Sequence, residues 1–183
     1  MTASLYGPEF FVGRRDTVLR SAAVIVPIVC DLLGAPESLL DVGCGQGEWL
    51  DMFGQLVPDV YGVDIAAPDD PRMIRHDLTL ALDLGRQFDL VISLETAEHL
   101  PAAAEDVYLD TLACHSDTIL FSAAVPGQEG IGHINCQPHQ HWHDKLAERG
   151  YAVWDRVRPL IADDPRVSPW YRNNLFIYIA GVA

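Results

Sequence analysis

The stretch Leu40-Asp-Val-Gly-Cys-Gly-Gln-Gly-Glu-Trp49 decides the fold of this chain. It begins inside a short apolar run, Ser38 to Val42, of the kind that forms a buried parallel strand. Glycines follow the run, and a helical pattern follows the glycines. Glycines between a strand and a helix let a ligand approach the backbone closely, because no side chain stands in the way. The stretch therefore predicts a strand–loop–helix unit with a ligand at its loop.

Strand-like and helix-like segments alternate along the rest of the chain. Strands are expected at 38–42, 60–64, 73–77, 88–94, 118–123, 151–158 and 174–180. Helices are expected at 14–33, 46–56, 102–114 and 138–149. Such alternation predicts an α/β fold with a mainly parallel, doubly wound sheet, helices on both faces and ligands at the carboxyl ends of the strands.

Length and composition favour one globular domain. The chain has 183 residues, of which 49% are hydrophobic and 21% charged, enough for a core without staples. We expect a single domain over 1–183, with an N-terminal helical segment (1–36) packing on it. The apolar stretch 21–33 follows several arginines, but it contains Pro27 and Asp31 and is too short to span a bilayer, so no membrane association is expected.

Charge and cysteine usage restrict the partners and the compartment. The net charge of -14, from 26 acidic residues against 12 Lys and Arg, repels phosphate backbones, so nucleic acid is not expected as a partner. The four cysteines are scattered and form no CxxC pair, which favours reduced thiols and a cytoplasmic location. Either a monomer or a homodimer is compatible with these features.

The spacing of the glycines separates three kinds of nucleotide site. A P-loop needs Gly-Lys-Ser/Thr, which is absent, and the dinucleotide fingerprint GxGxxG would need glycine where Glu48 stands. The pattern is GxGxG, preceded by Asp41. Asp41-Val-Gly-Cys-Gly-Gln-Gly47 resembles motif I of class I methyltransferases that use S-adenosylmethionine (SAM), and the likeness extends over nearly the whole chain, closest to the type 11, UbiG-like branch.

The resemblance implies a Rossmann-like, mainly parallel seven-stranded sheet and a set of cofactor contacts. The glycine loop would pass beside the methionine part of SAM, with Asp41 ordering it. Asp64 would accept hydrogen bonds from the ribose hydroxyls, a role that two carboxylate oxygens suit. Asp77 would contact the adenine amino group, and Leu94-Glu95 would line the methionine end. The full expected set for SAM, and for the product S-adenosylhomocysteine, is Asp41, Gly43, Cys44, Gly45, Gly47, Trp49, Asp64, Ile65, Asp77, Leu78, Leu94 and Glu95.

The segment Glu95-Thr-Ala-Glu-His-Leu100 offers groups on the acceptor side. Methyl transfer is an in-line displacement, so the protein mainly aligns a nucleophile and manages one proton. The segment resembles the E-x-x-E-H-[LV] sequence of many small-molecule methyltransferases. There the first acidic residue faces the cofactor, which makes Glu95 the functional candidate. For Glu98 and His99 the resemblance implies a structural role at the start of the helix.

A second set of candidates lies in the connection from Pro126 to Gln137, whose glycines suggest a mobile loop over the site. Its Gly-His-Ile-Asn-Cys-Gln sequence resembles a G-H-x-N-x-Q signature of some tailoring methyltransferases. His133 is a candidate general base, because an unperturbed imidazole titrates near neutrality; the alternative is a histidine that fixes the loop. Asn135 and Gln137 would orient either the acceptor or the loop.

The same region also contains several residues of the types that bind metals. His133, Cys136, His139, His141 and His143 are close in sequence, and His139 and His143 are one helical turn apart. A helix starting at Pro138 would point His141 away from the other two, and histidine-rich helices are commonly solvated faces. We therefore expect no metal.

Aromatic residues at both ends of the chain are further candidates for the acceptor pocket. They are Tyr6, Phe10 and Phe11 before the first helix and Trp170 and Tyr171 before the last strand, with Arg172 as a possible partner of an acidic acceptor. Core packing is the competing explanation for most of them. The expected activity is methyl transfer to a small molecule, at oxygen of a sugar or secondary metabolite. The alternatives are an N-methyltransferase acting on an amino sugar or amine, and a non-catalytic SAM-binding partner subunit.

Overall fold

The computed structural model describes residues 13–181 and contains one seven-stranded sheet. The strand order is β3-β2-β1-β4-β5-β7-β6, and β7 alone runs antiparallel to its neighbours. The strands are β1 (Ser38–Val42), β2 (Asp59–Asp64), β3 (Met73–Arg75), β4 (Leu90–Leu94), β5 (Thr118–Ser122), β6 (Tyr151–Trp154) and β7 (Phe176–Ala180). The expected doubly wound, Rossmann-like sheet is confirmed.

Helices connect the strands. They are α2 (Arg15–Leu32), α3 (Glu48–Phe53), α4 (Glu105–Ala113), α5 (His139–Ala147), α6 (Arg158–Ile161) and α7 (Pro169–Asn174), with short 3₁₀ turns η1 (Ala97–His99) and η2 (Ala102–Ala104). The long N-terminal helix α2 is the expected one, and Gly34 follows it with a left-handed φ of +74°. None of the helices in the described range 13–181 is both long enough and apolar enough to cross a bilayer.

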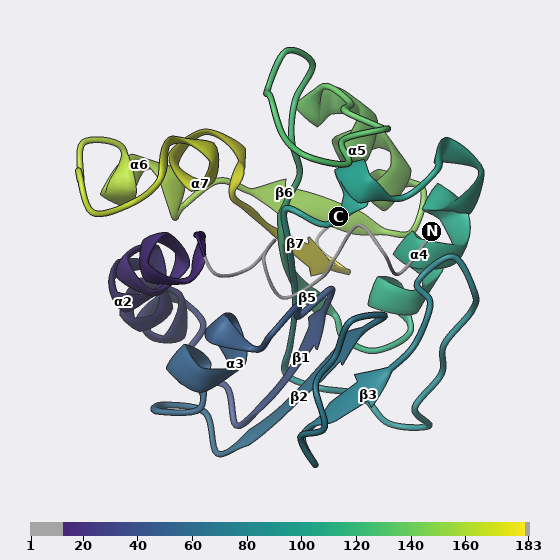
Figure 1. The fold of residues 1–183 in the computed structure, drawn as a ribbon, viewed down its shortest axis with the longest axis horizontal. Helices are drawn as coiled ribbons and strands as arrows, with labels where there is room; N and C mark the ends of the chain where they lie inside the picture. Colours follow the sequence, from purple (N-terminus) through teal and green to yellow (C-terminus); the bar gives the residue numbers. More distant parts are fainter. Residues whose placement is uncertain (1–12, 182–183) are drawn as a thin grey trace.

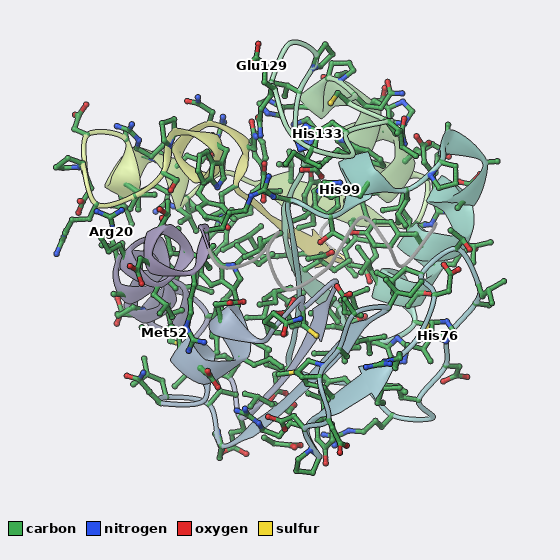
Figure 2. The ribbon with its side chains drawn as sticks, in the orientation of Figure 1. Arg20, Met52, His76, His99, Glu129 and His133 are labelled. Atoms are coloured by element: carbon green, nitrogen blue, oxygen red, sulfur yellow. The ribbon has the colours of Figure 1, made fainter. Side chains whose placement is uncertain are left out.

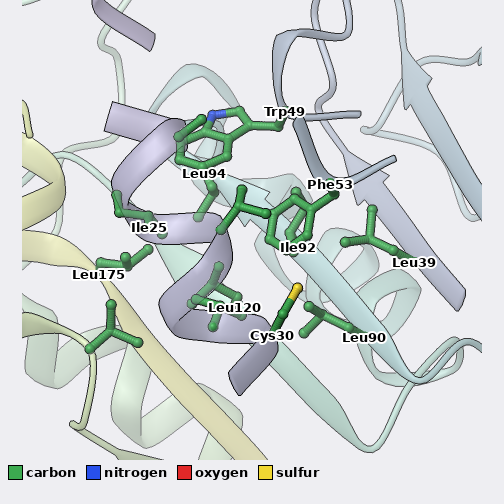
Figure 3. Close-up of a cluster of buried hydrophobic side chains, with 14 of the residues drawn as sticks. Ile25, Cys30, Leu39, Trp49, Phe53, Leu90, Ile92, Leu94, Leu120 and Leu175 are labelled. Carbon is green, nitrogen blue, oxygen red and sulfur yellow. The ribbon is translucent and has the colours of Figure 1, made fainter. Parts of the chain in front are cut away.

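Two hydrophobic clusters sandwich the sheet, and successive strand residues alternate between them. Leu39, Leu90 and Ile92 face α2, α3 and α7, whereas Leu40 and Val91 face α4 and α5. Figure 1 shows α2 and α3 on one side of the sheet and α4 and α5 on the other. Figure 3 shows side chains of the first cluster packed against the α2 helix. Burial on both faces explains why the strands read as continuous apolar runs.

Several element boundaries expected from the sequence were wrong, among them those of β3, which ends at Arg75, and β4, which begins at Leu90. The strand expected at 151–158 ends at Trp154, because Val157 is buried in the first hydrophobic cluster and the chain turns into α6. The strand expected at 174–180 begins at Phe176, since Asn174 closes α7. Neither α6 nor α7 was expected; both have proline in the first turn, where its missing N–H costs nothing.

The fold sets the place of the site. Strand order reverses between β1 and β4, so the chain leaves these two neighbouring strands in opposite directions and a crevice forms where their loops begin. Gly43 follows β1 and Glu95 follows β4 at this edge. The expected glycine loop and the expected acceptor segment therefore start next to one another.

Candidate active site

A cavity of about 290 Å³ opens at the crevice between the β1 and β4 loops. Its walls come from five parts of the chain: the start of α2, the glycine loop with α3, the segment after β4, the loop after β5, and α7. The lining includes Arg14, Thr17, Gly43, Cys44, Gly45, Glu48, Trp49, Leu94, Glu95, Glu98, His99, Gln128, Glu129, Gly130, His133, Trp170 and Tyr171. Cofactor and acceptor candidates thus border one space.

The glycine loop has the backbone that its sequence requires. Gly43, Gly45 and Gly47 all have positive φ, of +92°, +55° and +90°. A Cβ on Gly43 would stand 2.3 Å from Oγ1 of Thr96 in the neighbouring loop. Two features therefore exclude a side chain at position 43: the left-handed backbone and the close contact with the segment after β4.

Asp41 lies beneath this loop in the sheet and is 2% exposed. Its Oδ2 has no hydrogen-bond partner within residues 13–181. Burial, reinforced by the negative charges of Asp64 and Glu48, raises the pKa of Asp41 well above its usual range. An unsatisfied buried carboxyl beneath a ligand-binding loop costs stability unless the loop or its ligand compensates for it.

Asp64, at the end of β2, already holds part of the glycine loop. Its two carboxylate oxygens accept hydrogen bonds from the backbone N–H of Gly45, at 3.0 Å, and of Ala66, at 2.7 Å. Burial raises its pKa, and these two amides act in the opposite direction. A carboxylate has about four acceptor positions, so capacity remains for ribose hydroxyls.

Asp77 and Leu78, the residues expected near the adenine, follow β3. The carboxylate of Asp77 accepts from the backbone N–H and the hydroxyl of Thr79, at 2.9 and 2.8 Å, which lower its pKa. Leu78 is buried in the second hydrophobic cluster, and Ile65 is half-buried after β2. None of the four residues Asp64, Ile65, Asp77 and Leu78 lines the 290 Å³ cavity, whereas Cys44, Trp49, Leu94 and Glu95 do.

Glu95 combines an unusual backbone with a satisfied side chain. Its φ of +52° is left-handed, which is uncommon for a residue other than glycine and often marks a functional site. Its carboxylate accepts hydrogen bonds from Gln128, at 2.7 Å, and from Asn174, at 3.4 Å. Burial nevertheless raises its pKa. The amide donors thus fix an acidic group at the cavity wall.

Glu98 and the histidines His99 and His133 form a polar cluster at the cavity wall. Nε2 of His133 lies 3.9 Å from Oε1 of Glu98, and the two imidazole rings are 5.0 Å apart between centroids. Burial lowers the pKa of His99 to about 4 and also lowers that of His133. Both imidazoles are therefore neutral at pH 7, which is the state of a proton acceptor or a metal ligand.

The loop after β5 is attached to this cluster through its backbone. The carbonyl of Glu98 accepts hydrogen bonds from the N–H groups of Ile134 and Asn135. The amide of Asn135 is buried and donates to Glu105, and Gln137 donates to Asn135. Neither Asn135 nor Gln137 lines the cavity. Their contacts favour orientation of the loop, and a direct role with the acceptor stays a prediction.

Aromatic residues of α7 and α3 form the opposite wall. Trp49 meets Tyr171 edge to face, with ring centroids 5.3 Å apart, and Trp170 packs beside Tyr171. Trp49 is also part of the first hydrophobic cluster, so it serves both the core and the cavity (Figure 3). Arg172 points elsewhere and donates to the carbonyl of Ala162. The candidates Tyr6, Phe10 and Phe11 lie outside the described residues.

Sequence reasoning missed several cavity residues. Arg14, Thr17 and Gln128 carried no motif, and Glu98 and His99 were assigned to loop structure. For Glu98 and His99 the available signal was the Glu-x-x-Glu-His spacing. A turn directly after a strand places these side chains at the carboxyl edge of the sheet. Partners for Arg14 and Gln128 come from distant segments, so no local pattern reveals them.

Solved structures of similar fold are mostly described as methyltransferases. The sugar N-methyltransferase KedS8 from Streptoalloteichus sp ATCC 53650 superposes with a TM-score of 0.70 at 21% identity, covering 94% of this chain and 91% of its own. DesVI from Streptomyces venezuelae gives 0.67 at 14% identity, with 98% and 99% covered. CalS10, an amino pentose methyltransferase from Micromonospora echinaspora solved with SAM bound, gives 0.62 at 16% identity, with 86% and 89% covered.

The sequence itself matches a family model. No curated protein is significantly similar to the chain. Residues 19–153 match the model described as a methyltransferase domain, a span that includes the glycine loop, Asp64, Glu95, Glu98 and His133. This chain belongs to the methyltransferase domain family.

Proposed function

We propose that this protein transfers the methyl group of SAM to an oxygen atom of a small molecule, a sugar or a secondary metabolite. The observation that carries the proposal is the position of His133. Its Nδ1 is bonded to the carbonyl of Gln128, at 3.2 Å, which directs Nε2 to Glu98 at the cavity wall. A neutral imidazole in that position accepts the proton of a hydroxyl group as its oxygen attacks the methyl carbon.

The cofactor would lie along the glycine loop, with its methionine part beside Gly43, Gly45 and Leu94. Asp64 would bind the ribose and Asp77 the adenine, as the resemblance implies. The glycine loop, Glu95 and the Glu98–His133 cluster line the same cavity, which supports placing the sulfonium methyl between the loop and the cluster. In-line displacement needs the acceptor oxygen opposite the sulfur, and the aromatic residues Trp170 and Tyr171 would hold the acceptor there.

The size of the cavity and the net charge of the protein support a small acceptor. A cavity of about 290 Å³ is near the lower limit for small-molecule pockets. The net charge of -14 disfavours a polyanion. We also propose the type 11, UbiG-like branch for this chain, a cytoplasmic location, and a monomer or homodimer as the active form.

A second candidate is methylation of an amine. The half-buried carboxylate of Glu95 and the buried carboxylate of Glu98 would stabilise an amino sugar in its cationic form. The relatives KedS8 and CalS10, described as sugar and amino pentose methyltransferases, give this reading further support. A non-catalytic SAM-binding subunit is the third candidate, and the retained polar cluster opposes it.

Labelled SAM offered with matched neutral sugars and amino sugars tests the acceptor atom. Product with hydroxyl acceptors supports the proposal, and product with amino sugars alone establishes the second candidate. Calorimetry with SAM and S-adenosylhomocysteine tests the cofactor site separately. Asp64→Ala is expected to weaken both ligands about tenfold or more, since the ribose loses a charged acceptor. Unchanged affinity would refute the role of Asp64.

A further inference from the structure

Three possible metal ligands converge at the acceptor end of the cavity. Glu98 and His99 belong to η1 after β4, and His133 belongs to the loop after β5. One ligand atom of each lies within 4.8 Å of the other two. Figure 2 shows His99 and His133 close together, with His76 at a distant part of the molecule.

Glu98 is a buried carboxylate whose negative charge is only partly compensated. It is 0% exposed, and neither carboxylate oxygen has a well-formed hydrogen bond within the described chain. Burial and the charge of Glu95 raise its pKa well above the usual range. The backbone amides of Glu98 and Ala124 and the cation of Arg14 oppose this only in part. A buried carboxylate that also feels the negative charge of a second one is stabilised by positive charge next to it.

Both imidazoles are oriented as metal ligands commonly are. Nδ1 of His99 is 3.1 Å from the carbonyl oxygen of Gly132, and Nδ1 of His133 is 3.2 Å from that of Gln128. A carbonyl oxygen only accepts, so each Nδ1 carries the proton and the lone pair of each imidazole lies on Nε2. Metal-binding histidines are held in this way by a backbone carbonyl, which fixes both tautomer and ring orientation.

We propose that Glu98, His99 and His133 bind one divalent transition-metal ion, through a carboxylate oxygen and two Nε2 atoms. This proposal rests on the proposed function, because the ion would use its open positions to bind the acceptor hydroxyl. Two imidazoles and one carboxylate suit Mn²⁺, Fe²⁺, Co²⁺ or Zn²⁺ better than Mg²⁺ or Ca²⁺. The proposal of a metal ion also replaces our expectation from the sequence that no metal is bound.

The geometry requires a modest contraction. Bonds of about 2.1 Å to the ion place neighbouring ligand atoms roughly 3 Å apart. The 3.9 Å between Oε1 of Glu98 and Nε2 of His133 must therefore shorten by about 1 Å. His133 lies in a connecting loop, where a shift of this size needs no change in the sheet.

The chemistry balances without any further reagent. An acceptor hydroxyl bound to the ion has a lowered pKa and releases its proton to water. Its oxygen then forms the new O–CH₃ bond, the S–CH₃ bond breaks, and the electron pair of that bond stays on sulfur to give S-adenosylhomocysteine. In the metal-bound enzyme the lone pair of His133 binds the ion, so His133 does not act as the general base. The ion instead promotes loss of the proton by lowering the pKa of the hydroxyl group.

The histidine-rich helix α5 does not form a comparable site. Nε2 of His139 is bonded to Asn174 and Nδ1 of His143 to Tyr178, and their rings are 6.4 Å apart. Across residues 13–181, the cluster of Glu98, His99 and His133 is the group that meets the spacing of metal ligands. Of the five residues weighed from the sequence, His133 alone belongs to it.

Metal binding can be measured without any acceptor. Protein treated with EDTA and returned to chelator-free buffer is titrated with Co²⁺, whose visible absorption reports coordination, and with Mn²⁺ in a calorimeter. We expect one ion per chain in the wild type. Glu98→Gln and His133→Ala should each weaken binding at least tenfold. Glu98→Gln keeps the side-chain volume and removes a buried charge, so its fold should persist.

His76→Ala is the matched control, since His76 is a half-buried histidine remote from the cavity. It should bind Co²⁺ like the wild type. The proposal is overturned if the wild type binds no ion, or if Glu98→Gln and His133→Ala bind as well as His76→Ala does. A methyl-transfer assay separates this result from the proposed function. Transfer that is fully retained in EDTA refutes the metal, whereas specific ion binding without transfer to any hydroxyl refutes the proposed acceptor.

Discussion

Gln128 donates a hydrogen bond of 2.7 Å from Nε2 to Oε2 of Glu95, and so joins the loop after β5 to the residue that follows β4. Asn174 at the end of α7 donates to both side chains, at 3.4 Å to Glu95 and 2.9 Å to Gln128. Three distant segments thus meet at one carboxylate whose backbone is left-handed. This contact explains how a loop and a short helix are held over the cavity.

Gln128→Ala should lower the free energy of unfolding by about 1–3 kcal/mol, because it leaves the half-buried carboxylate of Glu95 without its shortest donor. Urea denaturation measures the change. Adding Glu95→Gln should recover most of the loss, since the charge that needed the donor is gone. Gln140→Ala, at an exposed glutamine of α5, should change stability by less than about 0.5 kcal/mol. Equal effects at Gln128 and Gln140 would contradict the role of this contact.

Gly43→Ala should destabilise the protein and weaken SAM binding about tenfold or more, because the new methyl group strains the backbone and contacts Thr96. Thermal melting and calorimetry with SAM measure the two effects. Gly85→Ala is the control, since its φ is also positive, +65°, but nothing lies within 4 Å of the added Cβ. It measures the backbone cost alone. If the two variants lose equal stability, contact with Thr96 is unimportant.

Asp41→Asn should make the ligand-free protein more stable at neutral pH and should weaken SAM binding. The folded-state pKa of Asp41 lies above its unfolded value of 3.8, so the wild type loses stability as pH rises from about 4 toward the folded pKa. Asparagine does not ionise. The stability difference between variant and wild type should therefore grow over this range and then stay constant.

Melting temperatures measured from pH 4 to pH 8 test this, with the exposed Asp69→Asn as control. A difference that is independent of pH for Asp41→Asn would show that Asp41 is neutral in both states or charged in both. An increase in SAM affinity would refute its role beneath the glycine loop.

Gly130→Ala should reduce turnover while it leaves SAM affinity unchanged. A Cβ at this position would stand 2.1 Å from Nε2 of His133, so the imidazole must move away from Glu98. Turnover with labelled SAM, compared with SAM binding by calorimetry, separates the two effects. Ile131→Ala, an exposed position in the same loop, should retain both. Normal turnover in Gly130→Ala would mean that the position of the imidazole is unimportant.

The sequence by itself determined the central fold and the cofactor loop. The boundaries of β1 were predicted to the residue, and those of β2 and β5 to within one, because buried parallel strands appear as apolar runs bounded by turn residues. The glycine loop was recognisable because its function depends on backbone conformation, which glycine reports locally. Glu95 stood at a strand end that the same alternation placed at the site.

The tertiary structure alone decided which polar side chains meet. His139 and His143 are one helical turn apart, yet their hydrogen bonds lead to Asn174 and Tyr178. His133 instead meets Glu98 and His99, because the loop after β5 is bonded to the carbonyl of Glu98. Sequence periodicity describes neighbours along one element, whereas contacts between loops depend on how the sheet orders its strands. The ends of β4 and β5 are adjacent only once that order is formed, and the cluster forms with it.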